Sequence, residues 1–265
     1  MVERGGVVVT GAGGGIGAEV ARCLAGAGYG VVANDHGVGI DGASADGAVV
    51  RGVVAAIRAR GGRAVGHQRD VASFEATRDL VQLAVDVYGW LEAVVACHGV
   101  RRERMIFDMT EDEWDSVIAV HLTGAFNCVR FAAEHMREQR GGSIVLVGSA
   151  PGWAGGSAQA GVLGLAASAA TAMGRYDVNV NTVNTVTPAG PESSELVAAL
   201  VRALIDPDNR HVTGQAFTAD GRRLARWAPP EERESVRLDG ELAHSDVTVA
   251  VRDRLGLAVP TAGQR

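Results

Sequence analysis

Two stretches of this 265-residue chain carry residues that could do chemistry. The first is TGAGGGIG, from Thr10 to Gly17, which follows the apolar run GVVVT and precedes a helical pattern. Glycines between a strand and a helix let the backbone approach a pyrophosphate, and the N-terminus of the helix attracts its negative charge. In a chain with 36 glycines, the alternative is a plain tight turn. The setting favours a phosphate-binding loop.

The second stretch is GSAPGWAGGSAQAGVLGLAA, from Gly148 to Ala167. Ser149 follows the apolar run SIVLVG, and a pattern of small residues typical of a closely packed helix comes after it. A serine there could orient a substrate oxygen, but proton transfer needs a titratable side chain within reach. The stretch contains none, and the whole chain has 25 arginines and no lysine. A mechanism that needs a lysine is therefore excluded for this chain alone.

Carboxylates end two of the predicted strands. Asp35 closes VVAND, where a carboxylate can accept hydrogen bonds from a ribose diol and repels a 2′-phosphate, which favours NAD over NADP. Asp70 follows the third strand in the same way. The alternatives are a turn or helix-cap role for Asp35 and an N-cap role for Asp70 before VASFEATRDL.

Short apolar runs alternate with helical patterns along the chain. This alternation predicts an α/β fold, a Rossmann-like, doubly wound, parallel sheet of seven strands with helices on both faces. We expect a single domain over residues 1–221, and a C-terminal extension over 222–265 packed on the domain or at a subunit interface. The predicted strands are 6–10, 30–35, 63–68, 91–97, 143–148, 178–183 and 215–220. The predicted helices are 14–27, one ending near 60, 73–88, 111–120, 121–139, 160–174 and 192–205.

The composition limits the cellular locations and the binding partners that we expect. A net charge of −6 disfavours nucleic acid and anionic membrane surfaces as partners. The N-terminus shows no signal peptide, and no apolar run is expected to span a membrane. The three cysteines, Cys23, Cys97 and Cys128, lack the spacing of a metal site. We expect a cytoplasmic protein without a bound metal.

With these residues in place, the chain resembles the short-chain dehydrogenase/reductase family over residues 1–220. TGAGGGIG matches the family's glycine motif, and RDV (69–71) matches its adenine-contacting Asp-Val. VVANDHG (31–37), RRERMIFDMTEDEWDSVIAVHLTGAF (101–126) and GRYDVNVNT (174–182) are most similar to the (3R)-hydroxyacyl-CoA dehydrogenase domains of multifunctional β-oxidation enzymes and to actinobacterial dehydrogenases of steroid and acyl-CoA breakdown. The resemblance implies cofactor contacts from Thr10, Gly11, Gly15, Ile16, Gly17, Asp35, Asp70, Val71 and Gly99.

The chain departs from the family where the family does its chemistry. The resemblance calls for a serine, a tyrosine that acts as acid and base, and a lysine that lowers the pKa of the tyrosine. Ser149 matches the serine, but Val162 and Ala166 stand at the spacing of the other two. If SAQAGVLGL is aligned with the family's SAAKAGVLGL, Gln159 takes the lysine position and about seven residues are missing, the tyrosine among them. Ser149 is then a catalytic remnant.

Other departures concern the surroundings of the site. His98 replaces an alanine close to the cofactor, although a partly exposed loop histidine is the simpler interpretation. Asn184 and Thr185 stand where the family has Pro-Gly, and about twenty residues of the usual substrate lid are missing after them. His121 is shared with the subgroup, and we expect it to make backbone hydrogen bonds and not to act as a base.

Three functions remain open on this evidence. The first is a non-catalytic subunit that pairs, through helices 121–139 and 160–174, with itself or with a catalytically intact relative in acyl-CoA or steroid metabolism, with NAD weakly bound. The second is an NAD-dependent oxidoreductase with a non-standard site, using residues such as Ser149, His98, His121 and Arg101 or Arg102. The third is a non-redox enzyme or a sensor of NAD or acyl-CoA, in which Arg101, Arg102 and Arg104 could bind phosphate.

Overall fold

The structure is a computed structural model that describes residues 4–39, 46–148, 152–185 and 190–228, with short pieces at 232, 234–237, 247 and 249–251. The chain divides into two compact units, Met1–Trp227 and Ala228–Arg265. All the candidate site residues that the structure describes belong to the first unit. Of the second unit, only the short pieces beyond Trp227 are described, and they contain no sheet strand.

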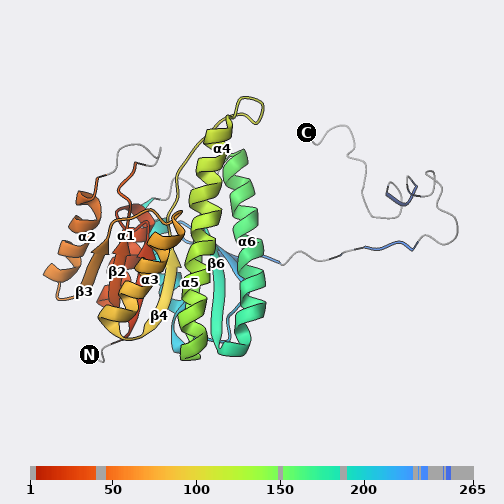
Figure 1. The fold of residues 1–265 in the computed structure, drawn as a ribbon. Coiled ribbons are helices and arrows are strands. Elements are labelled where there is room, and N and C mark those ends of the chain that lie inside the picture. Colours follow the sequence, from red (N-terminus) through yellow and green to blue (C-terminus); the bar gives the residue numbers. More distant parts are fainter. Residues whose placement is uncertain are drawn as a thin grey trace. The chain divides into compact units, whose positions relative to one another are not determined.

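The first unit is built on one sheet with the strand order β3-β2-β1-β4-β5-β6-β7-β8 (Figure 1). The first seven strands are parallel, as predicted, and the order reverses between β1 and β4. The predicted fold class is confirmed, but the strand count is corrected to eight, because Arg223–Arg226 pairs antiparallel with β7. The strands are β1 (Gly6–Thr10), β2 (Gly30–Asn34), β3 (Arg63–His67), β4 (Leu91–Ala96), β5 (Gly142–Gly148), β6 (Val178–Asn184), β7 (Ala216–Asp220) and β8 (Arg223–Arg226).

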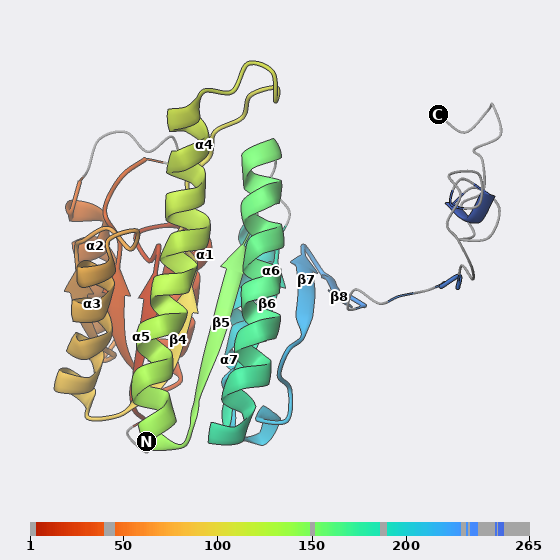
Figure 2. The same cartoon turned by 45° about the vertical axis from the view of Figure 1, so that its right-hand side comes forward.

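Helices cover both faces of the sheet. The core on one face includes residues of α1 (Gly15–Gly26), α2 (Ala48–Ala59) and α7 (Pro191–Leu204). The core on the other includes residues of α3 (Phe74–Tyr88), α5 (Gly124–Gln139) and α6 (Trp153–Met173), which Figure 2 shows in front of the sheet. Strands buried on both faces are runs of valine, which explains why GVVVT and its counterparts were recognisable in the sequence.

The two helices predicted over 111–120 and 121–139 form one continuous run. It consists of α4 (Glu111–Ile118), a π-helical turn at Ala119–Thr123, and α5. By length and composition this run could span a membrane, and it is the one such helix found among the described residues. A single helix of this kind is weak evidence for a membrane span. A core helix of a soluble protein passes the same test, and α5 here packs against α3 and β4.

Helix α6 begins seven residues before its predicted start at 160, directly after the break in the described chain at 149–151. Its first two turns bury Ala154 and Ala158 against Val117 of α4. The glycines of WAGGSAQAG disfavour a helix in isolation, so packing on α4 overrides the local preference. The consequence for the site is that Gln159 sits one and a half turns into a helix.

Candidate functional site

A cavity of about 760 Å³ opens at the carboxyl ends of the parallel strands, where the strand order reverses. This is the place where open α/β sheets bind their ligands. Eight of the nine residues predicted to contact a cofactor line it: Gly11, Gly15, Ile16, Gly17, Asp35, Asp70, Val71 and Gly99. The ninth, Thr10, is fully buried behind the cavity wall.

The glycine loop between β1 and α1 has the shape of a phosphate cradle. Gly11 has a φ of +62°, and a Cβ atom built there would lie 2.6 Å from the backbone oxygen of Cys97. A Cβ at Gly17 would collide with the backbone of Gly11, so both positions need glycine. A Cβ at Gly14 or Gly15 would meet nothing within 4 Å, because these residues face open space at the start of α1. Helix α1 has no side-chain cap, so its N-terminus is available to a phosphate.

Asp35 fastens this loop to the end of β2. Its Oδ2 accepts a hydrogen bond of 2.8 Å from the backbone N–H of Gly13, and its Oδ1 accepts one of 2.7 Å from the N–H of Gly37. The predicted turn role and the predicted ribose role are compatible, because each carboxylate oxygen can accept more than one hydrogen bond. Asp35 lines the cavity and is only partly exposed.

Asp70 and Val71 form the neighbouring wall. Asp70 Oδ1 accepts from the N–H of Ala72 at 2.9 Å, whereas the N-cap of α3 is Ser73. The suggestion that Asp70 caps this helix is therefore wrong. The buried carboxamide of Asn34 donates to the backbone oxygen of Arg69 at 2.9 Å and thereby fixes the turn that carries Asp70.

His98 is held between two elements and is not free in the groove. Its Nδ1 lies 2.6 Å from Oγ1 of Thr10, and that same Oγ1 accepts from the N–H of Cys97. Since the threonine oxygen is already an acceptor, it can donate its proton to Nδ1, which leaves the ring N–H to donate to the backbone oxygen of Val120. Burial, and then the neighbouring His121, lower the pKa of His98 to about 3. The ring is therefore neutral near pH 7 and ties β1 and β4 to the π-helical turn.

His121 makes the backbone hydrogen bonds that the sequence suggested. Its Nε2 lies 2.7 Å from the backbone oxygen of Val100 and 3.1 Å from the N–H of the same residue. Burial lowers the pKa of His121, and the backbone hydrogen bond only partly offsets this effect. Its ring lines the cavity beside Gly99, where a Cβ would approach it to 2.7 Å. A low pKa and an engaged nitrogen make His121 a weak candidate for a base.

Among the described residues, those at the positions of the family's catalytic tyrosine and lysine carry no charge. Ser149 lies outside the described residues. Val162 and Ala166, at the tyrosine and lysine spacing, are buried in the core of the sheet. Gln159 lies against Gly148 at the end of β5, and its Nε2 donates to Oδ1 of Asn184 on β6. The carboxamide of Gln159 thus reaches the ends of β5 and β6.

All three tyrosines are fixed at the opposite end of the sheet. Tyr29 precedes β2, Tyr88 ends α3, and Tyr176 precedes β6, so each is near the amino end of a parallel strand while the cavity is at the carboxyl ends. Each ring lies under an arginine guanidinium, with Arg4, Arg63 and Arg175 at 4.9, 5.3 and 5.0 Å from the respective ring centroids. Burial raises the pKa of Tyr29 and of Tyr88. None of the three can replace the missing tyrosine.

Two of the three arginines in the loop after β4 form ion pairs. Arg101 pairs with Glu103 at 2.6 Å, and Arg104 pairs with Glu113 at 3.0 Å. Arg101 and Arg102 line the cavity, whereas Arg104 does not. The sequence did not single out Asn34, Arg69 or Ser116, which also line it, because their positions depend on how the strand ends and helices pack.

Comparison with known proteins agrees with this geometry. Residues 6–198 match the short chain dehydrogenase family. The chain is 38% identical over 66% of its length to a short-chain type dehydrogenase/reductase of Mycobacterium tuberculosis, of which the match spans 64%. It is 33% identical to the hydroxyacyl-CoA dehydrogenase ChsB1 of the same organism, over 93% of this chain and 87% of that one. A crystal structure of a short chain dehydrogenase from Mycobacterium avium superimposes with a TM-score of 0.88 at 34% identity, over 98% of this chain and 97% of that one. The chain belongs to the short-chain dehydrogenase/reductase family.

Proposed function

We propose that this chain is a dinucleotide-binding subunit that does not transfer hydride on its own and acts together with a catalytically intact member of its family. The family binds a nicotinamide dinucleotide, and this chain offers a glycine cradle, an uncapped helix N-terminus and a carboxylate at the end of β2 to receive one. Asp35 favours NAD over NADP. When bound, the dinucleotide would supply a hydride acceptor or donor; Gly14, Gly15 and Asp35 would hold its phosphate and ribose.

The proposal that the chain does not transfer hydride on its own rests on the positions of the three tyrosines. A general acid or base must lie within hydrogen-bond reach of the reacting oxygen. All three tyrosines lie at the far end of the sheet, and the chain has no lysine to lower the pKa of a phenol. The two histidines in the cavity have lowered pKa values, and each has a ring nitrogen in a hydrogen bond. An oxidoreductase with a non-standard site is therefore disfavoured.

The test measures substrate turnover and nucleotide binding on the same purified protein. Purified protein is expected to show no oxidation of 3-hydroxybutyryl-CoA or of a 3-hydroxysteroid with NAD or NADP, although calorimetry detects NAD binding in the micromolar to millimolar range, weaker than is usual because the lysine contacts are missing. Turnover well above background that Ser149→Ala abolishes would show that the site is catalytic. Failure of both nucleotides to bind would show that the cradle is only a structural remnant.

Helices α5 and α6 are the surface that we propose for the partner. The exposed face of α6 carries only small side chains over four turns, from Gly156 through Ala160 and Gly164 to Thr171, which permits close approach of another helix. Phe126 is 45% exposed on α5, a helix that packs against α6. A second copy and an intact relative are both compatible with this face.

Co-expression with an intact relative encoded nearby tests this surface. The expected result is co-purification and a change in the activity of the relative. Gly164→Arg should abolish both effects, because a side chain at Gly164 projects into open space on the outer face of α6. Gly52→Arg is the matched control, since Gly52 is likewise an exposed helical glycine with nothing within 4 Å, but on α2. Equal behaviour of the two variants would place the partner elsewhere.

A further inference from the structure

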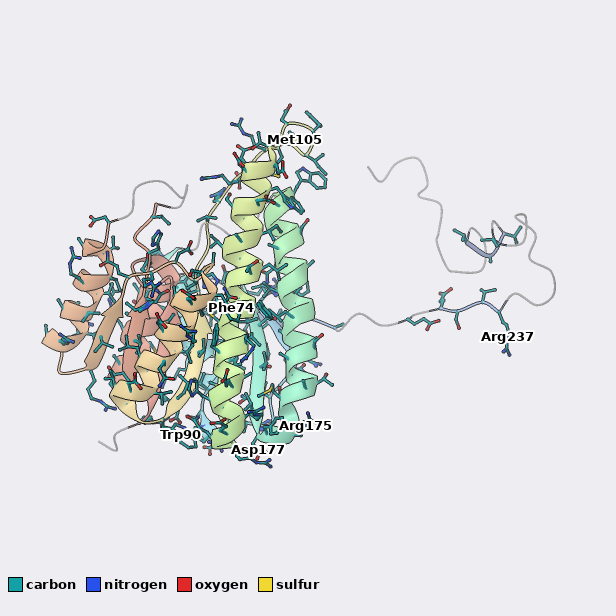
Figure 3. All side chains as sticks on the ribbon, in the orientation of Figure 1. Phe74, Trp90, Met105, Arg175, Asp177 and Arg237 are labelled. Carbon is teal, nitrogen blue, oxygen red and sulfur yellow. The ribbon has the colours of Figure 1, made fainter. Side chains whose placement is uncertain are left out.

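Five large apolar side chains project into solvent next to the mouth of the cavity. They are Met105, Ile106, Phe107, Trp114 and Trp153, with exposed fractions of 53, 61, 77, 39 and 52%. We call this set the apolar lip. Figure 3 shows Met105 at the tip of the loop that precedes α4. Soluble proteins rarely leave so many large apolar groups exposed together unless the surface binds something.

The apolar lip continues the wall of the cavity on three separate elements. The loop after β4 lines the cavity at Arg102 and carries Met105 three residues later. Helix α4 lines it at Val117 and carries Trp114 one turn earlier. Helix α6 lines it at Gly155 and begins at Trp153. A molecule that enters the cavity from this side therefore passes over the apolar lip.

The charge around the apolar lip restricts what can bind there. Residues 101–115 contain three arginines and six carboxylates. Two of the arginines form ion pairs, with Glu103 and Glu113. No ion pair is found among the described residues for the other four carboxylates, which are Asp108, Glu111, Asp112 and Asp115. Arg102 is the one remaining positive charge in this segment, so the excess charge is negative. Negative potential of this kind repels an anionic lipid surface and a free carboxylate or phosphate. It favours an uncharged or cationic group.

The side chains themselves favour a flat ring over an aliphatic chain. Three of the five are aromatic, and aromatic pairs gain binding free energy beyond what the area that they bury contributes. A methionine thioether adds favourable contacts to a ring edge, and a cation can lie over the face of tryptophan. We propose that the apolar lip binds the aromatic ring of a small molecule, uncharged or cationic near the ring, whose remaining part enters the cavity. This inference rests on the proposed function only in treating the cavity as a ligand site.

The test uses small probes with one ring and different charges. They are 2-phenylethylamine, 3-phenylpropionamide and 3-phenylpropionate, with heptylamine as an aliphatic amine, each titrated by saturation-transfer NMR with and without NAD. We expect the amine and the amide to bind at least threefold more tightly than the carboxylate, and 2-phenylethylamine to bind more tightly than heptylamine. Quenching of tryptophan fluorescence, to which Trp114 and Trp153 contribute, should follow the same order.

Matched variants separate the apolar lip from the rest of the surface. Ile106→Ser and Phe107→Ser should weaken the ring probes severalfold and leave NAD affinity unchanged. Val87→Ser is the control, because Val87 is 45% exposed near the end of α3, away from the cavity mouth. Equal probe affinity in Ile106→Ser and Val87→Ser overturns the proposal, as does tighter binding of the carboxylate. A change in oligomeric state without a change in probe affinity would overturn it in favour of a protein contact. Loss of NAD binding alone would reject the proposed function and not this inference.

Discussion

Asp35 offers the sharpest test of the cofactor end, because one side chain holds the glycine loop and, in the proposed function, selects NAD over NADP. In Asp35→Asn the shape is kept, but one carboxylate oxygen becomes an NH₂ group. That group then faces either the N–H of Gly13 or the N–H of Gly37, so one of the two hydrogen bonds, at 2.8 and 2.7 Å, is lost. A hydrogen bond to a charged group contributes about 1.5–3 kcal/mol, and partial exposure places this one at the lower end. We expect a loss of about 2 kcal/mol, which lowers the melting temperature by about 4–8 °C.

The effect on selectivity has an electrostatic origin. A 2′-phosphate placed beside a carboxylate at the protein surface is repelled by about 1–3 kcal/mol, and removing the charge removes the repulsion. The ratio of NADP affinity to NAD affinity should therefore rise about 5- to 150-fold in Asp35→Asn. NAD itself should bind somewhat more weakly, since a charged acceptor for the ribose hydroxyls becomes a neutral one.

The measurement is calorimetry with both nucleotides, paired with thermal unfolding. Asp206→Asn is the matched control, because Asp206 also accepts a backbone hydrogen bond, from the N–H of Asp208 at 3.0 Å, in a turn that does not line the nucleotide cavity. The control should change neither affinity. Unchanged selectivity in Asp35→Asn would refute the assignment of Asp35 to the ribose, and unchanged stability would refute its role in holding the loop.

Two further outcomes follow from the buried titratable groups. The pKa of His98 in the folded state, about 3, lies below its value in the unfolded state, so the unfolded state binds more protons. The free energy of unfolding should therefore fall as the pH drops from 7 to 4, by about 3 kcal/mol from His98 alone. His121 acts in the same direction, and His98→Asn should flatten the profile of unfolding free energy against pH; an equally steep profile in the variant would contradict the assignment. Burial raises the pKa of the thiols of Cys97 and Cys128 to about 12, so iodoacetamide at pH 8 should modify them far more slowly in the native protein than in urea; equal rates would show that neither thiol is protected.

The sequence predicted most of the fold because its strands are buried on both faces. Runs such as GVVVT and GVVAN have no polar alternation, and the spacing between them allows a helix, which leaves a parallel sheet as the solution. The strand β8 was missed because RLAR at an open edge lacks that apolar signal. The start of α6 was missed because its glycines oppose a helix locally, and tertiary packing on Val117 of α4 and its neighbours stabilises it.

The site also contains some residues that the sequence could predict and others that it could not. The loop from Gly11 to Gly17 and Asp35 are adjacent to strand ends, so sequence position alone placed them in the cavity. The role of His98 could not be predicted, because Thr10 becomes its partner only when β4 pairs with β1, 88 residues apart. The same holds for Gln159, whose contact with Asn184 depends on the pairing of β5 with β6.

That contact between Gln159 and Asn184 provides the last prediction. Each amide stands at a position where the family resemblance calls for another residue, and each would leave a polar group without a partner if the other were absent. Such a group costs about 1–3 kcal/mol, while removal of both together costs less than the sum. A double-mutant cycle of Gln159→Ala and Asn184→Ala, measured by urea unfolding, should therefore give a coupling energy of about 1 kcal/mol. The pair Gln82→Ala and Asp86→Ala, whose exposed hydrogen bond of 2.8 Å lies on α3, is the control and should give a smaller coupling. Additive effects at Gln159 and Asn184 would show that the two amides do not stabilise each other.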